Sequence, residues 1–128
     1  MSFESFAHVP VTEELLRHVW DGEIDLGKGG HRFGLGREGK TEFPVDWDIS
    51  RIEMAITEVL RQPQYLARNG NDILLGKQVG DVMVMVKLKK TSTQISAVTA
   101  FPDSGRGVIR NERGLRHPIP LNNFGRKA

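Results

Sequence analysis

The sequence predicts an α+β fold, in which N-terminal helices pack on a C-terminal antiparallel sheet. Apolar residues recur at helical spacing along 49–60, whereas along 82–101 they alternate with other residues at the spacing of a β-strand. Helices that precede strands, rather than alternating with them, are typical of this class. The 128 residues fit one domain. We expect the segments 1–11 and 118–128 to be peripheral to it.

The first helix is predicted to run from residue 13 to about Trp20. Thr12 is a good N-cap, and two glutamates follow it in the first turn, where the helix dipole favours acidic side chains. Apolar residues from Leu15 to Val19 then form one stripe. His18 lies on or beside this stripe, three residues after Leu15.

A glycine-rich loop and a second helix follow. The segment 21–41 carries seven glycines, which predicts a flexible loop. The second helix begins after Asp46 or Asp48, because residues 49, 52, 56, 59 and 60 form one apolar face. Pro63 ends it.

The second half of the chain is predicted to form strands after a polar connector at 69–72. Alternate residues along the first strand point to one face (Val82, Val84, Val86, Leu88), and their neighbours point to the other (Met83, Met85, Lys87, Lys89). A turn at 91–93 leads to an antiparallel partner, 94–101. We expect Ile95, Ala97, Thr99 and Phe101 to share one face of this partner. A short third strand is expected at 107–110.

Composition excludes several classes of protein. The absence of cysteine excludes a disulfide scaffold, thiol catalysis and a cysteine-based zinc site. No apolar run approaches the roughly 20 residues that span a bilayer. The first residues do not resemble a signal peptide. If the domain is exported, we expect the address to lie on a longer parent chain.

Positive charge is concentrated near the C-terminus, although the net charge is only +2. From position 106 onward the chain contains one acidic residue, Glu112, and six basic residues (Arg106, Arg110, Arg113, Arg116, Arg126, Lys127). Such a segment suits a phosphate-rich partner. A solvated basic tail has the same composition, so charge leaves both interpretations open.

Two of the four histidines are candidates for acid–base chemistry. His18 lies near the end of the first helix, and His31 follows two glycines in the loop. Two histidines at one phosphodiester can cleave RNA without metal, because one takes the proton of the 2′-hydroxyl and the other protonates the leaving 5′-oxygen. The alternative for His18 is a packed structural residue. His8 and His117 are interpreted as surface residues.

Other motifs compete for these residues. His18 and His31 with Asp21, Glu23 or Asp25 form a possible metal cluster, although no compact metal-binding spacing is present. The glycines at 34, 36 and 39 match a dinucleotide motif in letters only, because neither a strand precedes them nor a helix follows. The side chains of Lys87, Lys89 and Thr99 are able to converge on one face of the sheet, where lysine can stabilise phosphate. Alternating lysines also mark a solvated face.

Several strings, taken in order, resemble the bacterial EndoU nuclease family. They are His18-Val19-Trp20-Asp21-Gly22-Glu23, Gly29-Gly30-His31-Arg32, Gly39-Lys40-Thr41-Glu42-Phe43-Pro44-x-x-Trp47 and Ser96-Ala97-Val98-Thr99-Ala100-Phe101-Pro102. The resemblance extends from about Leu15 to Arg110. It implies the fold group that joins barnase, EndoU, colicin-type nucleases and RelE. It also implies an endoribonuclease that needs no metal or other cofactor and leaves a 2′,3′-cyclic phosphate.

The resemblance also implies roles for individual residues. His18 and His31 match the two catalytic histidines, and Thr99 matches a hydroxyl residue on the late strand. The third catalytic member is a lysine, for which Lys87 is favoured over Lys40 and Lys77. Four residues are expected to contact the substrate: Lys40, Phe101, and Arg106 and Arg110 of the basic segment. Phe101 stands where tyrosine is common, so it can stack on a base but offers no hydroxyl.

Members of this family are often toxin domains at the C-terminus of large secreted effectors, including contact-dependent growth inhibition proteins. The resemblance therefore implies a parent effector, delivery into the cytoplasm of a target bacterium, and transfer RNA as the substrate. It also implies a cognate immunity protein as partner, and no membrane insertion by this domain. Two other functions remain open from the residues: a non-enzymatic nucleic-acid-binding module that uses the basic tail, and a metal-dependent nuclease that uses the same histidines.

Overall fold

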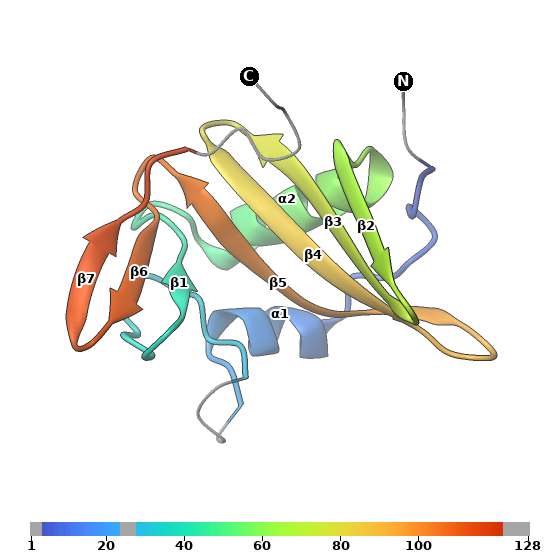
Figure 1. Ribbon diagram of the computed structural model, residues 1–128, viewed down its shortest axis with the longest axis horizontal. Coiled ribbons are helices and arrows are strands. Elements are labelled where there is room, and N and C mark those ends of the chain that lie inside the picture. The colour runs from blue at the N-terminus through green and yellow to red at the C-terminus, as the bar shows by residue number, and fades with distance from the viewer. Residues whose placement is uncertain (1–3, 24–27, 122–128) are drawn as a thin grey trace.

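The computed structural model describes residues 4–23 and 28–121, which form two helices and two antiparallel sheets (Figure 1). The helices are α1 (Glu13–Trp20) and α2 (Ile49–Arg61). The strands are β1 (Thr41–Glu42), β2 (Tyr65–Asn69), β3 (Asp72–Val79), β4 (Val82–Lys90), β5 (Ile95–Gly105), β6 (Ile109–Glu112) and β7 (Leu115–Pro118). The predicted α+β class is confirmed. None of the helices among the described residues is long and apolar enough to cross a membrane.

Both predicted helices are confirmed, and side-chain caps define their starts. The Thr12 hydroxyl accepts a hydrogen bond from the Leu15 N–H at 3.1 Å, and α1 ends at Trp20 as expected. At α2 the Asp48 carboxylate accepts a hydrogen bond from the Arg51 N–H at 2.9 Å. Asp48, rather than Asp46, is therefore the N-cap of α2.

The larger sheet has the strand order β2-β3-β4-β5, and α2 lies behind it in Figure 1. The β4–turn–β5 pairing was predicted, but the β2–β3 hairpin was not. Residues 69–72, which we interpreted as a polar connector, are the turn of that hairpin, in which Asn69 pairs with Asp72. Gly70 adopts a φ of +63°, a conformation that suits glycine in a tight turn.

The core lies between the larger sheet and the two helices. Val84, Val86 and Leu88 are buried there, as the alternating pattern predicts. The segment 1–11 was expected to be peripheral, but Phe6 and Val9 are almost fully buried in this core. At the other end of the chain, where 118–128 was expected to be peripheral, Pro118 belongs to β7 and Ile119 packs against the core, whereas residues 122–128 lie outside the described residues.

A β-bulge at residue 98 corrects the predicted face of β5. Lys87 pairs with Thr99, whereas the next residue, Leu88, pairs with Ala97, so the β5 residue between them has no partner of its own. Ala97 therefore lies on the core face with Leu88, and Thr99 lies on the opposite face with Lys87. The four residues that we expected to share one face (Ile95, Ala97, Thr99, Phe101) are divided between two.

The smaller sheet has the order β1-β6-β7 and lies at one end of the larger sheet (Figure 1). Thr41 of β1 pairs with Arg110 of β6, and β6 continues into a hairpin with β7. The strand expected at 107–110 is observed at Ile109–Glu112. β1 and β7 were not predicted, and β1 precedes α2, so the helices do not all come before the strands.

Candidate active site

The end of α1 and the segment after the glycine pair lie side by side, and this contact positions both candidate histidines. The chain reverses between them and forms a short ladder of backbone hydrogen bonds. Its members are Gly30 N–H to His18 O at 3.0 Å, His31 N–H to Val19 O at 2.6 Å and Arg32 N–H to Trp20 O at 3.2 Å. The two histidines are thereby held by adjacent backbone segments, although thirteen positions separate them in the sequence.

Gly29 allows this close approach. Its φ is +69°, and a Cβ atom at this position would lie 2.3 Å from the His18 carbonyl oxygen and 2.8 Å from His18 Nε2. Any side chain here would meet backbone as well as the imidazole. Position 29 therefore requires glycine for two reasons: its backbone has a positive φ, and His18 leaves no space for a Cβ atom.

His31 is buried and electrically neutral at pH 7. Its side chain is 5% exposed, and its Nδ1 lies 2.7 Å from the Thr41 carbonyl oxygen. Because a carbonyl oxygen only accepts, Nδ1 carries the proton and Nε2 has a free electron pair. The pKa of His31 is lowered to about 4, mainly by burial and to a smaller extent by the charges of Lys40 and His18, and the hydrogen bond to Thr41 offsets only part of this decrease.

His18 is held through both ring nitrogens. Its Nδ1 lies 3.0 Å from a carboxylate oxygen of Glu23, and its Nε2 lies 3.0 Å from the Thr99 hydroxyl. The carboxylate accepts, so Nδ1 carries a proton. Nε2 then either accepts from the Thr99 hydroxyl or, when the ring is doubly protonated, donates to it. Sequence analysis did not predict that Glu23 would bind His18, although Glu23 ends the quoted string that begins with His18.

A cavity of about 240 Å³ brings most of the predicted site residues together. We call it the histidine cavity, and it is lined by His31, Gly39, Lys40, Thr41, Thr99, Phe101 and Arg110. The Phe101 ring lies 6.0 Å from the His31 ring, centroid to centroid. His18 joins the cavity through its hydrogen bond to Thr99. Residues from α1, β1, β5 and β6 therefore meet at one place.

The lysines that were candidates for the third catalytic residue lie in different places. Lys40 lines the histidine cavity. Lys87 pairs with Thr99 across the strands, but its Nζ lies 3.9 Å from Asp72, and it is not among the lining residues. Lys77 contacts Glu58 of α2, with 3.4 Å between Nζ and the carboxylate. The structure places Lys40, rather than the favoured Lys87, next to His31.

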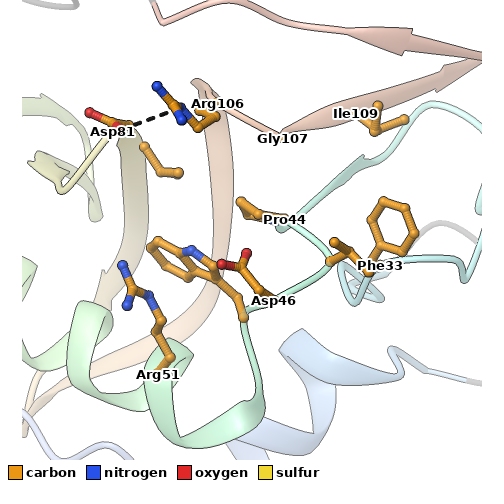
Figure 2. A pocket seen from close by; sticks show the side chains of 11 residues that line it. Phe33, Pro44, Asp46, Arg51, Asp81, Arg106, Gly107 and Ile109 are labelled. Atoms are coloured by element: carbon orange, nitrogen blue, oxygen red, sulfur yellow. Dashed lines mark ion pairs between the residues drawn. The ribbon is translucent and has the colours of Figure 1, made fainter.

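Arg106 lies away from the histidines. It lines a cavity of about 610 Å³ together with Trp47, and we call this space the Trp47 cavity. Phe33 and Asp81 also line it (Figure 2). Its Nε lies 3.5 Å from the Asp81 carboxylate, and its side chain is 86% exposed. Two consecutive residues of β6 line different cavities: Ile109 lines the Trp47 cavity, and Arg110 lines the histidine cavity. The smaller sheet therefore separates the two cavities.

Thr41 is a site residue that sequence reasoning missed. It is 8% exposed and lines the histidine cavity, and its hydroxyl has no hydrogen-bond partner among the described residues. A buried, unpaired hydroxyl is costly, so it suggests a contact with a ligand. A threonine within a loop-like sequence carries no signal of this kind.

Glu42 forms the structural support of the cavity wall and is fully buried. Burial alone raises its pKa, but hydrogen bonds from Arg116, Asn111 and two backbone N–H groups lower the pKa of Glu42 to about 2. These bonds join the glycine-rich loop, β6 and β7. They are Gly34 N–H at 2.8 Å, Gly36 N–H at 2.7 Å, Asn111 Nδ2 at 2.8 Å and Arg116 Nη2 at 2.8 Å. Arg116, one of the basic C-terminal residues, is thus paired internally.

The possible metal cluster does not form among the described residues. No group of three or more histidine or acidic side chains there is arranged to hold a metal ion. Asp21 instead pairs with Arg32 at 2.9 Å, and Glu23 pairs with His18. Asp25, the other candidate ligand, lies outside the described residues. His8 and His117 are exposed, as expected.

Comparison with known proteins found no matching family model, no matching curated protein and no matching solved structure. The chemistry of the histidine cavity therefore follows from its own residues. Those residues provide one imidazole with a free electron pair, a second imidazole that is able to donate a proton, two cations and an unpaired hydroxyl.

Proposed function

We propose that this protein is a metal-independent endoribonuclease, which cleaves RNA by attack of a ribose 2′-hydroxyl on the adjacent phosphorus. The observation that carries this proposal is that two histidines in different hydrogen-bonding states lie at one cavity and directly beside it. His31 has a free electron pair on Nε2, which is able to accept a proton. His18 has its Nε2 at the hydroxyl of Thr99, a residue that lines the cavity, and the doubly protonated ring is able to donate a proton there. Acid–base cleavage needs one group of each kind.

His31 acts as the general base. Its Nε2 accepts the proton of the 2′-hydroxyl while the 2′-oxygen forms a bond to phosphorus. The hydrogen bond from Nδ1 to the Thr41 carbonyl oxygen fixes the ring tautomer. A phosphate bound beside the ring adds negative charge, which favours the protonated imidazole as the reaction proceeds.

His18 acts as the general acid. In its doubly protonated form Nε2–H donates to the Thr99 hydroxyl in the resting protein and to the leaving 5′-oxygen during cleavage. The bond between phosphorus and the 5′-oxygen breaks, and the products are a 2′,3′-cyclic phosphate and a free 5′-hydroxyl. Glu23, 3.0 Å from Nδ1, orients the ring.

The remaining residues of the histidine cavity suit the phosphate and the base. Lys40 and Arg110 supply positive charge where charge develops on the phosphoryl oxygens. The Thr41 hydroxyl supplies a hydrogen-bond donor that has no partner within the described protein. Phe101 presents an aromatic ring on which a base can stack.

The biological setting is proposed from the sequence resemblance. It favours transfer RNA as the substrate, a cognate immunity protein as the partner, and delivery into a target bacterium as part of a larger secreted effector. Binding through the basic C-terminal residues alone is less well supported. Arg106, Arg110 and Arg116 each lie within 4.0 Å of an acidic side chain.

The test is incubation of the purified protein with total bacterial RNA in excess EDTA, beside His31→Ala and the control His8→Ala. His8 is exposed and lies outside the histidine cavity. We expect cleavage by wild type and His8→Ala, cyclic phosphate at the cut ends, and none with His31→Ala. Retained cleavage by His31→Ala would overturn the proposal. Cleavage that EDTA abolishes would assign the histidines to a metal-dependent nuclease, and RNA binding without cleavage would indicate a binding module.

A further inference from the structure

We infer that a second cavity, on the other side of His18, receives the nucleoside that leaves during cleavage. This inference rests on the proposed function. The cavity has a volume of about 470 Å³ and lies between the N-terminal half of α1 and the beginning of β5. We call it the α1–β5 cavity. Its volume falls within the roughly 300–1,000 Å³ of small-molecule sites.

His18 joins the two cavities. Its Nε2 contacts Thr99, which lines the histidine cavity, and its Nδ1 contacts Glu23, which lines the α1–β5 cavity. His18 itself also lines the α1–β5 cavity. The imidazole therefore stands between the two spaces. The inference requires that a substrate bound at Nε2 extends along the edge of this ring into the α1–β5 cavity.

The direction of the RNA follows from the roles of the histidines. The 2′-hydroxyl belongs to the upstream nucleotide, which must place it at His31 in the histidine cavity. The 5′-oxygen belongs to the downstream nucleoside and must lie at His18 Nε2, on the Thr99 side of the ring, so the nucleoside attached to it has to extend past the ring edge to reach the α1–β5 cavity. Since the α1–β5 cavity adjoins His18 and not His31, it is the space next to the downstream nucleoside.

Strand β5 lines both cavities. Residues 94–98 line the α1–β5 cavity, whereas Thr99 and Phe101 line the histidine cavity. The bulge at residue 98 lies where one lining ends and the other begins. Because the bulge moves Thr99 to the opposite face from Ala97, side chains of one continuous strand line both cavities.

The lining of the α1–β5 cavity suits a nucleoside rather than another phosphate. Glu14 and Glu23 contribute carboxylates, and Gln94 and Ser96 contribute an amide and a hydroxyl. Carboxylates repel phosphate but accept hydrogen bonds from ribose hydroxyls and base amino groups. Leu15 and other apolar residues provide a wall for the face of a base. Because Glu23 already contacts His18, Glu14 is the residue that we assign to the nucleoside.

The experiment compares two forms of an RNA oligonucleotide that contains one cut site. One form is complete, and in the other 4-nitrophenol replaces the downstream nucleoside. Nitrophenol leaves without an acid and carries none of the hydrogen-bonding groups of a nucleoside. The variants are Glu14→Ala and the matched control Glu13→Ala. Both glutamates lie in the first turn of α1, but Glu13 lines a different groove, towards α2.

We expect Glu14→Ala to lower kcat/KM for the complete RNA about tenfold, the effect of losing a hydrogen bond to a charged group. The nitrophenyl form should be cleaved at the wild-type rate, and Glu13→Ala should cleave both forms normally. Ser96→Leu, which fills the cavity, should reproduce the selective loss. Equal effects of Glu14→Ala on both forms, or no effect on either, would overturn the inference. If wild type cleaves neither form, the proposed function itself fails, and the inference fails with it.

Discussion

His18 and Thr99 lie eighty-one positions apart in the chain, yet the imidazole Nε2 of one is 3.0 Å from the hydroxyl of the other. This contact joins α1 to the edge strand of the larger sheet. It also fixes the orientation of the imidazole in the absence of substrate. Thr99 therefore links the candidate acid to the cavity that holds the candidate base, and it is the first residue to test by substitution.

Thr99→Val keeps the shape of the side chain but removes the hydroxyl. We expect RNA cleavage to fall about tenfold, because the His18 ring loses the partner that orients Nε2. The free energy of unfolding, measured in urea, should fall by about 1 kcal/mol or less. Thr99→Ser should restore activity. Full activity in Thr99→Val would show that the hydroxyl does not position His18.

Thr41→Val is expected to separate activity from stability. The Thr41 hydroxyl is buried without a partner among the described residues, so its removal should leave stability unchanged or raise it by about 1 kcal/mol. Cleavage should nevertheless decrease, since the hydroxyl contacts the phosphate in the proposed mechanism. Urea denaturation and initial cleavage rates measure the two effects. A loss of stability would indicate that the hydroxyl has a structural partner instead.

Gly29→Ala and Gly34→Ala form a matched pair, because both glycines have positive φ. At Gly34 a Cβ has no other atom within 4 Å, so only the backbone penalty of about 1–2 kcal/mol applies. At Gly29 the Cβ also meets His18. We expect a larger loss of stability and impaired cleavage for Gly29→Ala alone. Equal stability and activity of the two variants would contradict the close packing of Gly29 on His18.

The stability of the fold should depend on pH through His31. Its pKa is lowered from 6.5 to about 4, so the unfolded chain binds a proton more readily than the folded protein does. The contribution of neutral His31 is therefore fully present above pH 6.5 and is lost as pH falls towards 4. The loss amounts to about 3 kcal/mol. Urea unfolding of wild type and His31→Gln at pH 7 and pH 4.5 checks this, and parallel losses in both proteins would contradict it.

Glu42→Gln should be among the most destabilising single substitutions in this chain. It leaves Arg116 without its carboxylate, and breaking a buried ion pair costs about 3 kcal/mol. The cost lies at the low end of the usual range because the Arg116 side chain is 40% exposed. Glu38→Gln is the control, because Glu38 also accepts two backbone hydrogen bonds but is exposed. Similar thermal midpoints for the two variants would contradict the supporting role of Glu42.

The elements that the sequence predicted are those with a strong local pattern. Both helices have a cap and an apolar stripe, and β4 alternates without interruption. The β2–β3 hairpin was missed because the residues of β2 do not alternate clearly, so its polar turn was interpreted as a connector. The bulge at residue 98 was missed for a different reason. An extra residue in one strand depends on how two strands pair, which is not visible in either strand alone.

The site was predictable where chemistry is limited to a few residue types. Histidine was the clear candidate for acid–base work, and both candidate histidines lie at or beside the histidine cavity. The choice among Lys40, Lys77 and Lys87 depended on distances across the fold, and the structure places Lys40 there. The absence of a partner for the Thr41 hydroxyl is a property of the folded environment, and Thr41 was therefore missed.

The residues of the histidine cavity are synthesised at different times, because they come from distant parts of the chain. His18 and His31 are made early, whereas Thr99, Phe101 and Arg110 are made late. A ribosome adds residues from the N-terminus, so a nascent chain that has not reached β6 carries both imidazoles but not the residues that complete the cavity. If the protein is the proposed nuclease, translation products that end before β6 should therefore fail to cleave RNA, although they contain both histidines.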